Sequence, residues 1–173
     1  MTQQPLAIVD TSAIVLLLSS PSDEDDTTRA RRECTEHTFA RLTKEGARFG
    51  IPTPVVAELA RTGPGSAVAL KVIAALKRRA RFEELDLESA DVAGAMRILK
   101  LRERTPGQER GAISYDALIA GIAHQRGARW LLTANPRDFA ALLSTVKSNV
   151  ELVVTDQPPA KGQLSLVHAK KHT

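Results

Sequence analysis

Short apolar runs alternate with longer stretches in which apolar residues recur every three or four positions. Continuous runs rich in Val, Ile and Leu are typical of strands buried on both faces, and the longer stretches are typical of amphipathic helices. The predicted strands are residues 6–9, 48–52, 82–87, 128–133 and 150–154. The predicted helices are residues 11–18, 29–45, 54–62, 66–79, 88–104, 114–126 and 136–143. This alternation predicts an α/β fold, a three-layer α/β/α sandwich around a mostly parallel central sheet.

Loop signals divide the chain into one domain and a tail. Thr53 and Pro54 form a helix start, with Thr as the cap and Pro at the first helical position. Residues 19–28 are expected to form a polar, acidic loop, and residues 105–111 another loop. We expect a single domain over residues 1–154, followed by a flexible basic tail over residues 155–173.

The composition excludes several kinds of binding site and of protein. The chain has 173 residues, of which 43% are hydrophobic and only 3% aromatic, with a net charge of +4. So few aromatics make base stacking an improbable way to bind nucleic acid. Cys34 is the single cysteine, which excludes an internal disulfide and a thiolate zinc site. With no signal-peptide pattern, and an apolar run Ala13–Leu18 too short to span a bilayer, we expect a cytoplasmic protein without a membrane segment.

Two acids lie shortly after the carboxyl ends of predicted strands. Asp10 comes after the strand 6–9, and Asp138 lies shortly after the strand 128–133. Ligands of open parallel sheets bind beyond the carboxyl ends of the strands, so both carboxylates are candidates for a site there. Each also has a structural alternative: Asp10 can cap the next helix, and Asp138 falls in the first turn of a helix that Asn135 can cap.

Two further acids lie on predicted helices. Asp116 is in the first turn of the helix 114–126, where an acid also favours the helix dipole. Glu58 lies beyond capping reach in its helix, and composition alone favours a solvent-facing side chain there. The acidic run 23–26 is interpreted as a solvated loop, and the basic run 77–81 as a helix surface. The four histidines show no zinc spacing, and no nucleophile elbow or glycine-rich phosphate loop is present.

Taken together, four segments resemble the PIN-domain family, and most of all its VapC-type toxin ribonucleases. The segments are Ile8–Ala13 (IVDTSA), Ile51–Leu59 (IPTPVVAEL), Ser114–Ala120 (SYDALIA) and Leu131–Phe139 (LLTANPRDF). Each is short, but their order and spacing match the family pattern over roughly residues 6 to 154.

The resemblance implies a role for each acid. Asp10, Glu58, Asp116 and Asp138 resemble the four metal-binding and catalytic acids of the family. Supporting roles are implied for Thr11, Ser12, Thr133 and Asn135, and whether Asn135 or Asp138 lies nearer the metal stays open. The chain departs from the pattern at Ala134, where many relatives carry a polar residue, which puts a phosphate contact in doubt.

The implied activity is Mg²⁺- or Mn²⁺-dependent cleavage of RNA. Four neighbouring carboxylates repel one another unless a hard cation joins them, and Mg²⁺ and Mn²⁺ prefer oxygen ligands. Arg61 and the basic run 77–81 are candidates to follow the RNA backbone. The resemblance also implies a homodimer and a small antitoxin. The helical hairpin over roughly residues 53–79 is a candidate to bind a peptide of this antitoxin.

Two alternatives remain open within the family. One is an RNA-processing PIN nuclease without an antitoxin, and the other is an inactive PIN-like module that only binds RNA or protein. A metal phosphatase of another α/β fold is disfavoured, because the sequence after the first strand, Asp10–Thr11–Ser12, lacks a second Asp two positions after the first.

Overall fold

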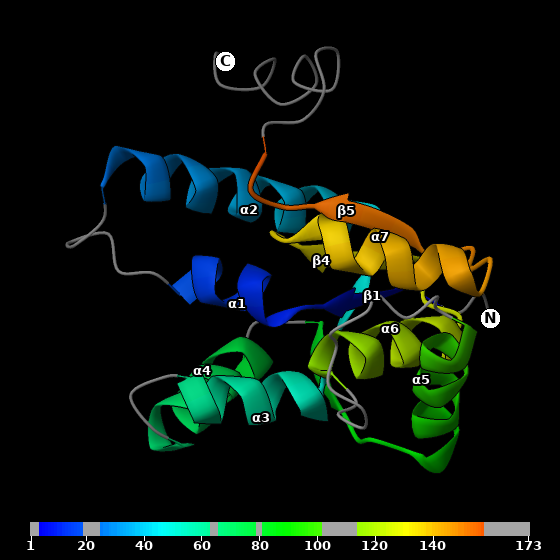
Figure 1. Ribbon diagram of the computed structural model, residues 1–173. Coiled ribbons are helices and arrows are strands. Elements are labelled where there is room, and N and C mark those ends of the chain that lie inside the picture. The colour runs from blue at the N-terminus through cyan, green and yellow to red at the C-terminus, as the bar shows by residue number, and fades with distance from the viewer. Residues whose placement is uncertain (1–3, 19–24, 63–65, 79–80, 102–113, 158–173) are drawn as a thin grey trace.

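The computed structural model describes residues 4–18, 25–62, 66–78, 81–101 and 114–157. Within these residues, five strands form one sheet in the order β3-β2-β1-β4-β5, and every neighbouring pair is parallel (Figure 1). The strands are β1 (Leu6–Val9), β2 (Arg48–Pro52), β3 (Phe82–Leu85), β4 (Trp130–Thr133) and β5 (Glu151–Val154). The predicted parallel α/β sandwich is confirmed.

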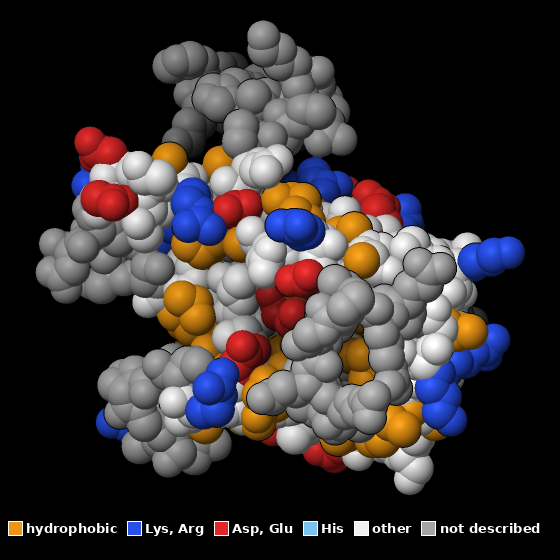
Figure 2. All heavy atoms as spheres, in the orientation of Figure 1, with side chains coloured by type: hydrophobic (Ala, Val, Ile, Leu, Met, Phe, Trp, Pro, Cys, Tyr) orange, Lys and Arg blue, Asp and Glu red, His pale blue; other side chains and the backbone are white. Residues whose placement is uncertain are grey.

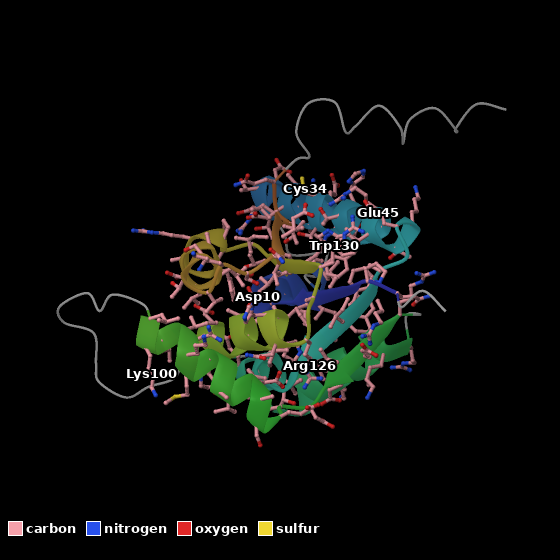
Figure 3. All side chains as sticks on the ribbon, turned by 90° about the vertical axis from the view of Figure 1, so that its right-hand side faces the viewer. Asp10, Cys34, Glu45, Lys100, Arg126 and Trp130 are labelled. Atoms are coloured by element: carbon pink, nitrogen blue, oxygen red, sulfur yellow. The ribbon has the colours of Figure 1, made fainter. Side chains whose placement is uncertain are left out.

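The helices cover both faces of this sheet. They are α1 (Thr11–Leu18), α2 (Asp26–Lys44), α3 (Thr53–Thr62), α4 (Ser66–Arg78), α5 (Ser89–Leu101), α6 (Tyr115–Gln125) and α7 (Pro136–Thr145). Viewed along the strands, the long helix α2 lies on one side of the sheet, and α5, α6 and α7 lie on the other (Figure 3). No helix of the described residues is both long enough and apolar enough to cross a membrane.

The core forms because the central strands are apolar on both faces. All residues of β1 and β4 are buried, as expected for a parallel sheet covered on each side. The rings of Phe39 in α2, Phe49 in β2 and Phe82 in β3 form one cluster, with centroids 4.9 to 5.7 Å apart. These aromatic contacts fix α2 over the β2–β3 half of the sheet.

The chain reverses its direction across the sheet at β1. After β1 it moves outward through β2 to β3, and it then returns to the other side of β1 to form β4 and β5. The carboxyl ends of β1 and β4 are therefore neighbours, and the backbone N–H of Asp10 donates to the carbonyl of Leu132 at 2.9 Å. In open parallel sheets, such a switch point is where ligands bind.

Two predicted helix starts need correction. Helix α2 begins at Asp26 and not at Arg29, because the carboxylate of Asp25 accepts a hydrogen bond from the N–H of Thr28 at 2.6 Å and caps the helix. This bond lowers the pKa of Asp25. Part of the acidic run is thus a helix start and not a loop. Thr53 does not cap α3 but is its first residue, and its hydroxyl donates to the carbonyl of Leu85 at 3.0 Å.

The domain also extends beyond its predicted end. Thr155, expected to begin a loose tail, is fully buried, and its N–H donates to the carbonyl of Thr133 at 2.9 Å. Asp156 forms an ion pair with Arg31 of α2 at 2.8 Å. Beyond the described residues lie the predicted loop 105–111, the remainder of the predicted tail after residue 157, and residues 19–24 of the acidic loop.

Candidate active site

Asp10 is buried at the switch point and is held by hydroxyl groups. Its side chain is 4% exposed, and its Oδ2 atom accepts hydrogen bonds from Ser12 Oγ at 2.6 Å and from Thr133 Oγ1 at 2.8 Å. Asp10 is also the residue before α1, and its carboxylate reaches the N–H of Ser12 at 3.4 Å. That capping bond is the longest of the three, so the capping interpretation accounts for only part of the contacts.

The two hydroxyls join the ends of β1 and β4 around this carboxylate. Ser12 Oγ and Thr133 Oγ1 lie 3.2 Å apart, the N–H of Ala134 donates to Ser12, and the N–H of Asn135 donates to Thr133, both at 2.9 Å. Among the described residues, no Lys, Arg or His forms an ion pair with Asp10. A buried carboxylate whose partners are hydroxyls and a backbone N–H is a candidate oxygen ligand for an added divalent cation.

Glu58 is connected to the same edge through Thr11. The hydroxyl of Thr11 donates to Glu58 Oε2 at 2.6 Å, and Glu58 is half-buried. The solvent-facing interpretation of Glu58 is therefore wrong. Since Thr11 directly follows Asp10, this bond joins the start of α1 to the second turn of α3.

Asp116 and Asp138 both lie in the first turns of helices that begin at the carboxyl edge. Ser114 caps α6 by accepting from the N–H of Ala117 at 3.2 Å, which leaves Asp116 half-buried in the first turn. Helix α6 precedes β4 and ends near the amino end of that strand. Its N-terminus therefore lies at the carboxyl edge of the sheet. Asp138 is half-buried in the first turn of α7, where Asn135 occupies the predicted cap position but its side chain makes no capping hydrogen bond.

The starts of α1, α3, α6 and α7 thus lie along one edge of the sheet, and each brings an acid in its cap, first turn or second turn. Acidic side chains gather near the middle of the face shown in Figure 2. Helix N-termini attract negative charge, which favours carboxylates in these positions. The topology therefore brings all four predicted acids to the same edge, although they are far apart in sequence.

The four acids do not converge into a finished metal cage. Within the described part of the chain, no three Asp, Glu, His or Cys side chains lie close enough together to hold one metal ion. The kinds of donor nevertheless fit a hard divalent cation, since carboxylate and hydroxyl oxygens are present and nitrogen and sulfur ligands are not among them. Asp10 Oδ2 is occupied by hydroxyl donors, whereas Oδ1 accepts no hydrogen bond from the described residues.

Of the predicted basic track, Arg61 lies on α3 three residues after Glu58, and so on the same side of the helix, whereas the described residues of the run 77–81 do not lie beside the acids. Lys77 forms an ion pair with Glu84, and Arg81 precedes β3 at the amino edge of the sheet. One cation near the acids was missed by sequence reasoning: Arg137 is exposed in the first turn of α7, between Asn135 and Asp138. Its place in the segment Leu131–Phe139 was the signal that could have found it.

The protein is thus an α/β domain with a parallel sheet whose carboxyl edge carries acids. Comparison with known sequences then identifies the family: the sequence model of the PIN domain matches residues 7–142, so the chain belongs to the PIN-domain family. No curated protein is similar enough in sequence to be counted as a relative.

Solved structures share this fold at low sequence identity. VapBC-1 from nontypeable Haemophilus influenzae is 16% identical, with a TM-score of 0.58, over 88% of this chain and 99% of that chain. VapBC2 from Rickettsia felis, bound to a DNA fragment from the promoter, is 18% identical, with a TM-score of 0.56, over 86% and 97%. VapC20 from Mycobacterium tuberculosis, described as a sarcin-ricin loop cleaving toxin, is 18% identical, with a TM-score of 0.53, over 78% and 93%.

Proposed function

We propose that this chain is a Mg²⁺- or Mn²⁺-dependent endoribonuclease, and that it is the toxin of a toxin–antitoxin pair. The observation that carries the proposal is Asp10, a buried carboxylate at the switch point whose partners are hydroxyls and not a cation. Membership of the PIN-domain family and the likeness to VapC-type structures support the same activity.

Each acid has a proposed role. Asp10, Glu58 and Asp116 hold the divalent ion directly or through water, and Asp138 orients water or binds a second ion. Such an ion lowers the pKa of a bound water and stabilises charge on the phosphate during an in-line displacement. Thr11, Ser12 and Thr133 keep the carboxylates of Glu58 and Asp10 oriented through the hydrogen bonds described above. Asn135 is a further polar ligand or water contact at this edge.

Arg137 is the proposed phosphate contact. It is exposed beside the site and has no ion pair within the described residues, so its guanidinium is available to a phosphate oxygen. It supplies the contact that Ala134 cannot make. The substrate is therefore RNA held by its backbone, with little base stacking.

The proposed partners are those of a cytoplasmic toxin. One is a second copy of the chain, which would bring two acidic sites together. The other is a small antitoxin, supported by the VapBC complexes among the similar structures. The hairpin of α3 and α4 is the proposed binding site for a peptide of the antitoxin. Growth arrest on induction of the chain, relieved by the product of a neighbouring short reading frame, would support this role; harmless overexpression would contradict it.

The activity is tested with purified protein on a structured cellular RNA, with Mg²⁺, with Mn²⁺ and with EDTA. We expect cleavage with either metal, no cleavage in EDTA, and a loss of at least about 100-fold in Asp10→Asn. Asp26→Asn is the matched control, because Asp26 is an exposed acid at the start of α2, and it should cleave as the parent does. Cleavage that persists in EDTA or in Asp10→Asn would overturn the metal mechanism.

One observation favours a second candidate, an inactive PIN-like module that binds RNA or protein. No three potential metal ligands of the described residues lie within reach of one ion. Calorimetric titration with Mn²⁺ separates the two functions, since a nuclease takes up the ion and a binding module has no need of it. An RNA-processing nuclease without an antitoxin would cleave in the same assay but leave growth unaffected.

A further inference from the structure

The amino edge of the sheet, opposite the acids, carries a row of arginines. Leu6 pairs with Arg48, and the pairs Phe49–Phe82 and Ala7–Trp130 place Arg81 and Arg129 at the same level of the sheet. The row therefore runs Arg81, Arg48, Leu6, Arg129 across four neighbouring strands. At about 4.8 Å per strand it spans roughly 14 Å. Figure 3 views the molecule from this edge, and basic side chains also gather on the corresponding side of Figure 2.

Most of the charge in this row is not neutralised. Arg48 forms an ion pair with Glu83. Arg81, Arg129 and nearby Lys147 are exposed and form no ion pair within the described residues. By contrast, the arginines of α2 at positions 29, 31, 32 and 41 each pair with an acid. The amino edge is thus a place where the fold leaves positive charge exposed.

The guanidinium of Arg129 is held in place by an aromatic ring. It lies 4.5 Å from the ring centroid of Trp130. This ring is buried, and its Nε1–H donates a hydrogen bond to Glu151 Oε2 at 3.0 Å. A stacked guanidinium loses less conformational freedom when it binds a phosphate than a free one does. Arg129 is therefore positioned in advance for an anion.

Two of the cations occupy positions that favour glycine. The turns leading into β2 and β4 contain Gly46 at φ 85° and Gly127 at φ 58°. The turns leading into β3 and β5 contain Arg81 at φ 89° and Lys147 at φ 49°. Side chains other than glycine are strained in this left-handed region, so a charged residue here points to a use for its charge.

We propose that Arg81, Arg129 and Lys147 form a second RNA-binding surface, which holds the phosphate backbone of the substrate on the side away from the acids. This inference rests on the proposed RNA substrate. A row of roughly 14 Å is long enough to contact more than one phosphate of an RNA strand. RNA that contacts both edges runs around the domain, which favours long or structured substrates over short oligonucleotides.

The test measures RNA binding without cleavage. A fluorescein-labelled single-stranded RNA of about 20 nucleotides is titrated with Asp10→Asn protein in EDTA, at several salt concentrations, and anisotropy is recorded. The edge variant carries Arg81→Gln, Arg129→Gln and Lys147→Gln. The matched control carries Lys71→Gln, Arg97→Gln and Lys100→Gln, which removes the same charge from exposed positions of α4 and α5 that form no ion pair within the described residues.

We expect the edge variant to bind at least about 10-fold more weakly, and its salt slope to fall by about 2, since each lost phosphate contact removes about 0.7. The control should lose less than about 2-fold. Equal losses in both variants, or parental affinity in the edge variant, would overturn the proposal; in the latter case an acidic protein would be the ligand to test. Because no cleavage is needed, an inactive site leaves this result readable.

A glycine variant separates binding from stability. Arg81→Gly with Lys147→Gly relieves the left-handed strain, so the Tm should stay the same or rise while RNA affinity falls. A lower Tm with unchanged affinity would mean that these cations serve the helix ends and turns, and would also overturn the proposal.

Discussion

Two aspartates of this protein are buried almost equally, but their surroundings differ. Asp91 at the start of α5 is 2% exposed, and Asp10 is 4% exposed. Asp91 accepts hydrogen bonds from Arg126 Nη2 at 2.7 Å and from the N–H of Glu88 at 2.9 Å. Asp10 has hydroxyl partners and one long backbone contact.

The difference distinguishes a carboxylate that the fold neutralises from one that we propose to bind a cation. Arg126 neutralises Asp91 inside the fold, and the hydrogen bond with Asp91 raises the pKa of Arg126. Nothing of opposite charge neutralises Asp10 among the described residues, so its charge is available to an added cation. Helix starts and hydroxyls make this uncompensated charge tolerable without cancelling it.

The largest effect is expected from breaking the structural pair. Asp91→Ala leaves the half-buried Arg126 without its main partner and should lower the free energy of unfolding by about 3 kcal/mol. Urea denaturation measures it. Glu88→Ala is the control, since it removes an exposed partner of the same arginine and should cost less than about 1 kcal/mol. Equal losses in the two variants would erase the distinction between the two aspartates.

Asp10 should respond in the opposite way. In EDTA, Asp10→Asn should unfold with nearly unchanged or higher free energy, because it removes an uncompensated charge. With Mn²⁺ at about 100 times its Kd, the parent should gain about 2.7 kcal/mol, and the variant should gain almost nothing. Thermal unfolding with and without Mn²⁺ measures this, with Asp26→Asn as the control that keeps the gain. A parent protein that Mn²⁺ does not stabilise would contradict the cation-binding role of Asp10.

The hydroxyl of Thr133 should contribute a smaller amount. Thr133→Val removes a donor to Asp10 and the acceptor for the N–H of Asn135, and should cost about 1–2 kcal/mol of unfolding free energy. Thr133→Ser keeps the hydroxyl and should recover most of the loss in chemical denaturation. If Thr133→Ser is destabilised and Thr133→Val is not, the methyl group and not the hydrogen bond holds this position.

The smallest effect concerns Asp156, an acid paired with Arg31 near the surface. Burial first, and the charges of Asp156 and Glu33 next, raise the pKa of Cys34. Asp156→Asn should therefore lower the pKa of this thiol, so alkylation of the single cysteine becomes faster at a given pH below the pKa. Unfolding free energy should change by less than about 1 kcal/mol. A slower reaction would show that the charge of Asp156 does not act on Cys34.

The local pattern of apolar and polar residues predicted most helices and strands. It failed at one helix cap and at a residue whose burial depends on distant partners. The strands β1 and β2 have their predicted bounds, because continuous apolar runs after helix ends leave few alternatives. Helix α2 starts earlier than predicted since the Asp25 cap, four residues before Arg29, was counted as loop. Thr155 was assigned to the tail because its burial depends on Thr133 and on the hydroxyl of Thr35, which donates to its carbonyl at 3.3 Å.

The sequence by itself determined the parallel α/β class, and it predicted the four acids that the fold places along one edge. Periodicity follows from backbone geometry, and a carboxylate after a buried strand faces the same edge whatever the rest of the chain does. Only the tertiary structure decided which carboxylates are neutralised. Each of Asp10, Glu58 and Asp91 has a partner from a segment 35 to 123 residues away: Thr133, Thr11 and Arg126. Electrostatic interactions depend on distance in space, which no spacing along the chain can reveal.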